Sequence, residues 1–138
     1  MLEDGLWRNR SFYFGPDGVR AHYDKINLAM RERARFAPGE RLPVFDILIA
    51  GVPVRFGVQM CREIRYPEQW RALAQQGAQI IAYPNNGVGS ARGDALWRAH
   101  LISRAAETQR LITGGNNASA AQPCPTMMPE PRGEANAC

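Results

Sequence analysis

The chain of 138 residues lacks the sequence features that mark membrane and exported proteins. It has no run of about 18 or more apolar residues, the length that a membrane-spanning helix needs. Its start, MLEDGLWRNR, lacks the basic segment followed by an apolar segment that forms a secretory signal. We therefore expect a cytoplasmic protein with no membrane partner.

Cysteine is scarce and follows no pattern. The three cysteines lie far apart and form no Cys-x-x-Cys pair: Cys61, Cys124 and Cys138. This spacing argues against a disulfide framework and against a structural zinc site. The two histidines, His22 and His100, have no partners at metal-ligand spacing. We expect no metal site, and a reducing compartment.

Neither sign of charge is concentrated in one part of the chain. The formal net charge is +4, from 17 Lys and Arg against 13 Asp and Glu, and the two signs are interleaved. Nucleic-acid-binding proteins usually gather their basic residues into a patch or stripe, so we expect no nucleic-acid partner. With 45% hydrophobic and 22% charged residues, the composition fits one globular domain or a large piece of one.

Periodicity and turn residues predict alternating strands and helices. Strands are expected at 11–14, 20–23, 44–50, 54–60, 79–83 and 111–113, and a helical turn or two at 29–36. Helices are expected from Pro67 to Gly77 and over 95–109, with Asp94 as the N-cap of the second. The alternation from 54 to 113 is typical of an α/β sheet covered by helices.

The strand expected at 54–60 is followed directly by a lone cysteine, Cys61. Open α/β sheets place their reactive groups at the carboxyl ends of strands. A thiol attacks a carbonyl only as the thiolate, and Arg62, Arg65 and the helix from Pro67 would favour that form. On spacing alone, a lone intracellular cysteine at a strand end is more often a small buried apolar side chain than a nucleophile.

Four segments together resemble the carbon-nitrogen hydrolase, or nitrilase, superfamily in their order and spacing. They are YDKINL (23–28), ERARFAPGE (32–40), RFGVQMCREIRYPEQWRALAQQGAQIIAYPNN (55–86) and WRAHLISRAAETQRLITGGN (97–116). The resemblance implies an α/β fold of the α-β-β-α sandwich type. It also implies hydrolysis of a non-peptide carbon–nitrogen bond in a small amide, carbamoyl or nitrile compound through a cysteine thioester. It implies no cofactor, and family members often form dimers, so a homo-oligomer is a possible assembly.

The resemblance also assigns roles to individual residues. Cys61 matches the nucleophile and Lys25 the catalytic lysine, whose ammonium would stabilise an oxyanion together with the backbone N–H of Arg62. Glu32 matches a glutamate that orients the lysine or assists deacylation, and Glu63 matches a structural acid that we expect to pair with an arginine. Without the motifs, Lys25 would be a solvated surface residue and Glu32 one member of the exposed charge run RERAR.

Two asparagines follow the strand expected at 79–83. Asn85 and Asn86 lie where a loop would meet the crevice of the sheet and contact substrate, although Asn before Gly is equally a turn signal. These two residues are our candidates for substrate contacts.

The general-base glutamate of the family lies upstream of the lysine motif, and no stretch of this sequence matches it. We therefore expect residues 1–138 to form one partial domain that lacks the N-terminal third and the closing strands, with irregular structure over 119–138. Without that base the thiol proton has no acceptor, so we expect this chain alone to be inactive. The alternative is a truncated or degenerate relative that acts as a binding or assembly module.

Overall fold

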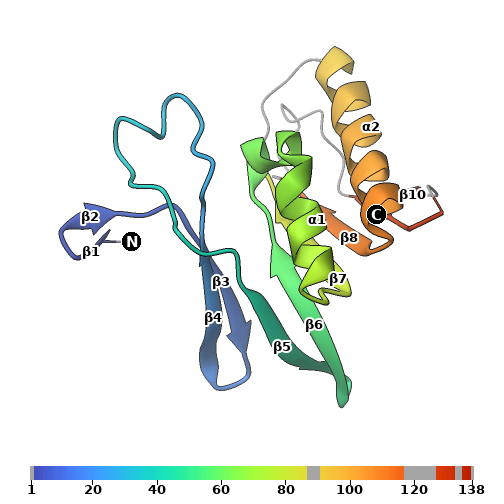
Figure 1. Ribbon diagram of the computed structural model, residues 1–138, viewed down its shortest axis with the longest axis horizontal. Coiled ribbons are helices and arrows are strands. Elements are labelled where there is room, and N and C mark those ends of the chain that lie inside the picture. The colour runs from blue at the N-terminus through green and yellow to red at the C-terminus, as the bar shows by residue number, and fades with distance from the viewer. Residues whose placement is uncertain (1, 87–90, 117–126, 133–134, 138) are drawn as a thin grey trace.

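The computed structural model describes residues 2–86, 91–116, 127–132 and 135–137. Its main feature is a six-stranded sheet with the strand order β10-β9-β8-β7-β6-β5 (Figure 1). The strands are β5 (Val44–Ile49), β6 (Val52–Val58), β7 (Ile80–Pro84), β8 (Leu111–Gly115), β9 (Met127–Pro129) and β10 (Ala135–Ala137). No helix of the described part is long and apolar enough to cross a membrane.

Three neighbouring strands at the centre of the sheet, β6, β7 and β8, run parallel. Helices α1 (Pro67–Gln75) and α2 (Ala91–Thr108) connect them in turn. Parallel strands need such crossovers, and their carboxyl ends meet at one edge of the sheet. The α/β alternation predicted over 54–113 is therefore confirmed, and Cys61 and Asn85 follow two strands at the same edge.

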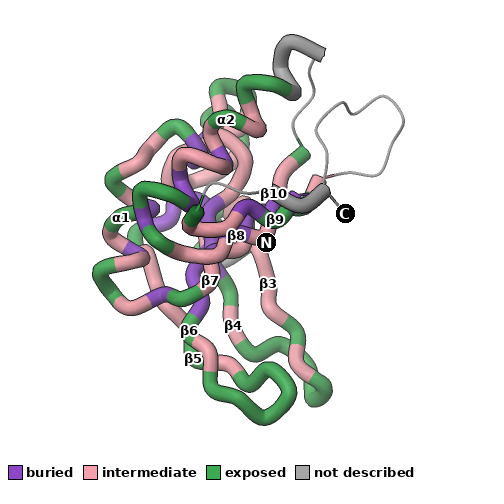
Figure 2. Tube along the Cα trace, turned by 90° about the vertical axis from the view of Figure 1, so that its right-hand side faces the viewer, coloured by how far each residue is buried: buried purple, intermediate pink, exposed green. Residues whose placement is uncertain are grey.

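Both helices cover the same face of the sheet. Their buried side chains Trp70, Leu73, Leu101 and Ala105 pack against Ile81 and Ile112 of the strands. At Gly57 of β6, an added Cβ would come within 2.7 Å of a methyl carbon of Leu73, so this close helix–sheet approach requires glycine. Figure 2 shows the buried segments concentrated in the central strands and the helices facing them.

A two-stranded hairpin, β3 (Arg10–Gly15) and β4 (Gly18–Asp24), lies on the other side of the sheet from the helices (Figures 1 and 2). Tyr23 of β4 joins Phe56 and Val58 of β6 in a second core cluster. The ring of Tyr13 lies 5.3 Å from that of Phe56. The sheet is thus covered on both faces, as in a sandwich. The remaining pair, β1 (Leu2–Glu3) and β2 (Leu6–Trp7), is short.

Some local expectations differ from the structure. Helix α2 begins at Ala91, so Asp94 lies inside the helix and is not its N-cap; the preceding Ala91 and Arg92 are good helix formers. Segment 29–36, by contrast, forms the helical turns expected there: the N–H groups of Arg33 and Phe36 donate to the carbonyl groups of Ala29 and Glu32, four residues earlier. Within 119–138, where we predicted irregular structure, β9 pairs with β8 and β10 pairs with β9. Cys124 and Cys138 lie outside the described residues.

Candidate active site

The segment after β6 forms a tight turn that begins at Cys61. The strand ends at Val58, and a short 3-10 helix, η1, spans Cys61–Arg65. Cys61 has φ = 45°, in the left-handed region that residues other than glycine rarely adopt. Such backbone costs about 1–3 kcal/mol and is concentrated at functional sites. Cys61 is a partly exposed free thiol rather than a fully buried apolar side chain.

A fully buried carboxylate, that of Glu63, anchors this turn. Its Oε2 accepts the N–H of Met60 at 2.7 Å. Its Oε1 accepts the hydroxyl of Tyr23 at 2.8 Å and the N–H groups of Ile26 and Asn27 at 2.9 Å. Burial raises the pKa of Glu63 above its usual value, although these hydrogen bonds favour the ionised form.

The arginine partner that we predicted for Glu63 is wrong. The carboxylate points into the protein, where backbone N–H groups of two loops and a tyrosine hydroxyl need an acceptor. Ile26 and Asn27 directly follow Lys25, and Glu63 follows Cys61 by two positions. The Glu63 side chain therefore ties the segment of the lysine to the turn of the cysteine.

Lys25 is buried, with 1% of its surface exposed, rather than solvated. Its ammonium donates to Oε2 of Glu32 at 2.7 Å and to Oε1 at 3.0 Å. Glu32 also accepts the N–H of Ala29 at 2.6 Å and the side-chain amide of Asn9 at 2.7 Å. Burial would raise the pKa of Glu32, but the hydrogen bonds, led by that of Lys25, hold it below its usual value. Glu32 thus stays charged beside the ammonium.

The family model of the carbon-nitrogen hydrolases matches residues 3–127 of this chain. The chain belongs to the carbon-nitrogen hydrolase family. It is 33% identical over 108 residues to an (R)-stereoselective amidase of Pseudomonas sp and 34% identical over 113 residues to a deaminated glutathione amidase of Yersinia enterocolitica. These matches cover 78% and 74% of this chain, but only 37% and 38% of the relatives.

Solved structures of the same superfamily share the fold. One is Nit3 of Saccharomyces cerevisiae, a member of branch 10 of the nitrilase superfamily. It superposes with a TM-score of 0.79 and 25% identity over 97% of this chain and 50% of that chain. The predicted superfamily and fold class are therefore confirmed.

In this member of the carbon-nitrogen hydrolase family, side chains from three elements bind the carbonyl groups of η1. Tyr83 of β7 donates its hydroxyl to the oxygen of Cys61 at 2.5 Å. Nε1 of Trp70 in α1 donates to the oxygen of Glu63 at 2.9 Å, and Nε of Arg104 in α2 donates to that of Ile64 at 3.2 Å. Sequence reasoning assigned no role at the site to Tyr83, Trp70 or Arg104. The sequence offers one signal for Tyr83: a tyrosine within a strand expected to be buried needs a hydrogen-bond partner for its hydroxyl.

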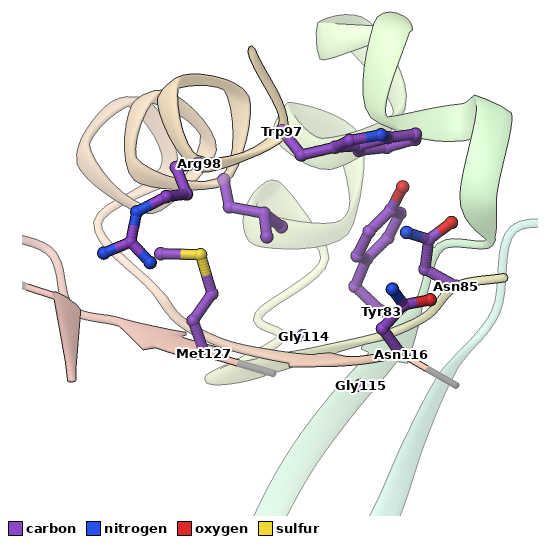
Figure 3. A pocket seen from close by; sticks show the side chains of 9 residues that line it. Tyr83, Asn85, Trp97, Arg98, Gly114, Gly115, Asn116 and Met127 are labelled. Atoms are coloured by element: carbon purple, nitrogen blue, oxygen red, sulfur yellow. The ribbon is translucent and has the colours of Figure 1, made fainter. Parts of the chain in front are cut away.

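Asn85, the first residue after β7, lines a small cavity. Figure 3 shows Asn85 next to Tyr83, with Trp97 above the tyrosine ring and Arg98 across the pocket. This cavity of about 10 Å³ has room for a single water molecule and not for a substrate. The N–H of Asn85 donates to the oxygen of Gly115 at 2.8 Å, and Asn86 is exposed. Their contact with substrate stays a prediction.

The described residues contain no group of three or more His, Cys, Asp or Glu side chains that could hold a metal ion. His22 is exposed and His100 is partly buried. Burial lowers the pKa of His100, and Arg104 and Arg65 lower it further. The segments of Cys61 and Lys25 offer a thiol, an ammonium, two carboxylates and backbone N–H groups.

Proposed function

We propose that this chain carries the nucleophile and the oxyanion-binding groups of an amidase that acts on a small amide, carbamoyl or nitrile compound. The observation that carries the proposal is the link through Glu63, which joins the turn of Cys61 to the segment of the buried Lys25. Attack on a carbonyl carbon requires a nucleophile and a donor that stabilises the developing oxyanion. The Glu63 side chain would hold the segments that carry these two groups together.

With an amide, the reaction has two steps. The sulfur of Cys61 bonds to the carbonyl carbon, the carbon–nitrogen bond breaks, and the thiol proton leaves with the nitrogen as ammonia. Water then opens the thioester, which yields the carboxylic acid and restores the thiol. A reducing, cytoplasmic location, which we also propose, would keep this thiol free.

Two donors would stabilise the negative oxygen of the tetrahedral intermediate. They are the ammonium of Lys25 and the N–H of Arg62, for which the hydrogen bonds of the described chain include no acceptor. Glu32 would hold the ammonium in position through its two hydrogen bonds. Removal of one such donor typically lowers the rate by about 10²–10³-fold.

The relatives support amides as the substrate class. Two of the proteins that this chain resembles are called amidases, one of them (R)-stereoselective and the other acting on deaminated glutathione. Because the chain spans 37% and 38% of their lengths, their substrates remain proposals for it.

A base for the thiol proton is the missing part of this arrangement. Among the described residues, no carboxylate or imidazole is hydrogen-bonded to the sulfur of Cys61. Attack without a proton acceptor is slow, so we propose that the 138 residues alone turn over little amide. This separates the proposal from a binding module, which would gain nothing from an added base.

The test is ammonia release from small aliphatic amides, with and without imidazole as an external base. We expect little release from the wild-type chain in plain buffer, an increase with imidazole concentration, and no increase above background in Cys61→Ala. Lys25→Met should lose most of the increase. Equal imidazole-dependent rates in the wild type and Cys61→Ala would refute the nucleophile, and binding of amide without any release would favour the binding module.

A further inference from the structure

Tyr83 is held in a fixed position beside the turn of Cys61. It is 1% exposed, and its ring centre lies 5.6 Å from that of Trp70 and 6.0 Å from that of Trp97. Figure 3 shows the Tyr83 and Trp97 side chains facing each other. The two tryptophans leave the phenol little freedom to move. Its hydroxyl donates to the carbonyl oxygen of Cys61 at 2.5 Å.

This carbonyl group belongs to the same peptide unit as the N–H of Arg62. In a planar trans peptide the C=O and the following N–H point in opposite directions. A donor that fixes the oxygen of Cys61 therefore also fixes the direction of the Arg62 N–H, which points away from Tyr83. A hydrogen bond accepted at the oxygen also polarises the peptide and strengthens its N–H as a donor.

The backbone at Cys61 needs such a restraint. Its φ of 45° is unfavourable for a residue with a side chain. The hydrogen bond at its oxygen helps to hold this conformation, because it restrains ψ of Cys61, the torsion that orients the Cys61–Arg62 peptide. The other two side-chain donors of the turn, Trp70 and Arg104, bind the carbonyl groups of Glu63 and Ile64. Of the three, only Tyr83 acts on the peptide that carries the Arg62 N–H.

We propose that Tyr83 is a positioning residue that orients the N–H of Arg62 toward the oxyanion of the reaction. The inference rests on the proposed function, because it assigns Tyr83 a part in the same chemistry. Tyr83 itself touches no reacting atom. Its hydroxyl acts through one peptide plane, so its loss weakens oxyanion stabilisation and leaves the sulfur of Cys61 in place.

Two reagents separate this role from a general effect on the thiol. With p-nitrophenyl acetate, sulfur bonds to the carbonyl carbon, an oxyanion forms, and the C–O bond breaks to release p-nitrophenolate. With iodoacetamide, sulfur displaces iodide from a methylene carbon and no oxyanion forms. Both reactions use the thiolate, so the ratio of their rate constants cancels the thiolate fraction and reports on oxyanion stabilisation.

The experiment measures both second-order rate constants at Cys61 in the full chain. The background from Cys61→Ala is subtracted from the ester rate, and alkylation is followed on the tryptic peptide 56–62. N-acetylcysteine gives the ratio for a thiol with no oxyanion donors. The variants are Tyr83→Phe, which keeps the ring between the tryptophans, and Tyr13→Phe as a matched control, because no hydrogen bond from the Tyr13 hydroxyl is found among the described residues.

We expect the wild-type ratio to exceed that of N-acetylcysteine, and Tyr83→Phe to lower it by about 10-fold, part of the loss seen when a donor is removed outright. The iodoacetamide rate should change less than about 2-fold in Tyr83→Phe, and Tyr13→Phe should keep the wild-type ratio. An unchanged ratio in Tyr83→Phe, or an equal fall of both rates, would overturn the inference and leave the proposed function standing. A wild-type ratio equal to that of N-acetylcysteine would instead refute the proposed oxyanion site itself.

Discussion

Glu32 and Glu63 each gather several hydrogen bonds from loops of the site, but their partners differ. Glu32 accepts the ammonium of Lys25, a side-chain amide and one backbone N–H, and 23% of its side chain is exposed. Glu63 is fully buried, and its partners are a tyrosine hydroxyl and three backbone N–H groups. One carboxylate faces a cation, and the other faces only neutral donors.

The difference explains why their pKa values move in opposite directions. For both residues burial raises the pKa, but at Glu32 the hydrogen bonds and the charge of Lys25 outweigh burial, and at Glu63 burial dominates. Glu63 is therefore the carboxylate that holds the fold of the site together. Glu32 is the one that holds the ammonium of Lys25, and the proposed function gives that ammonium a part in the chemistry.

The largest expected effect is that of Glu63→Ala on stability. The substitution leaves the buried hydroxyl of Tyr23 and three N–H groups without an acceptor, and each unpaired group costs about 1–3 kcal/mol. We expect a loss of more than about 3 kcal/mol in the free energy of unfolding, measured by urea denaturation. Glu63→Gln, which keeps one carbonyl oxygen, should lose less. A variant Glu63→Ala as stable as the wild type would show that these bonds are not a structural anchor.

Glu32→Gln should separate reactivity from stability. The carboxylate is partly exposed, so we expect a stability loss of only about 1 kcal/mol. Acylation of Cys61 by p-nitrophenyl acetate should slow by about 10-fold, because the ammonium of Lys25 is no longer held by a charge. If Glu32→Gln instead destabilised the protein as much as Glu63→Gln and left acylation unchanged, the two glutamates would have the same role.

The contributions of Glu32 and Glu63 to the free energy of unfolding should change in opposite directions as the pH is lowered. A lowered native pKa means that Glu32 contributes stability above its unfolded pKa of about 4.3, and this is lost as pH falls through the native value. A raised native pKa means that the contribution of Glu63 is largest below the unfolded value and falls as pH rises through the native one.

The unfolding free energy of each Gln variant, subtracted from that of the wild type and followed between about pH 3 and 7, checks this. We expect the difference for Glu32→Gln to shrink toward acid and that for Glu63→Gln to grow. Curves of the same slope for both variants would contradict the contrast in their environments.

The smallest effect is expected at an ion pair outside the site. Asp17 and Arg20 form a bridge at the tip of the β3–β4 hairpin, with 78% and 51% of their side chains exposed. Exposed pairs contribute little, so Asp17→Asn should change the unfolding free energy by less than about 0.5 kcal/mol. A larger loss would mean that the contribution of a carboxylate to the free energy of unfolding depends on its charge and not on its burial.

The sequence predicted the parts of the fold that depend on local pattern. The helix predicted from Pro67 to Gly77 and the strand predicted at 79–83 follow from side-chain spacing and turn residues, and the structure confirms them as α1 and β7. The predicted start of α2 and the irregular structure predicted over 119–138 were wrong. The helix begins at Ala91, before Asp94, and a strand of three residues such as β9 carries almost no sequence pattern.

Some residues of the candidate site could likewise be predicted from the sequence, and others could not. Cys61, Lys25 and Glu32 were found through the motifs of a family, since a lone thiol, lysine or glutamate carries no signal of its own. The partners of Glu63 lie up to 40 residues away on a hairpin and its following loop, so no local pattern could show them. The role of Tyr83 depends on how β7 packs beside β6, and its ring fits the core pattern equally well with or without a partner for its hydroxyl.

The central claim is that the sulfur of Cys61 and the ammonium of Lys25 act on the same carbon. A crystal structure of the chain reacted with a small aliphatic aldehyde tests it most directly, because the resulting thiohemiacetal carries an oxygen where the oxyanion would form. We expect this oxygen within about 3.1 Å of Nζ of Lys25 and of the backbone nitrogen of Arg62. An adduct whose oxygen points to solvent, with Lys25 still engaged only by Glu32, would contradict the account.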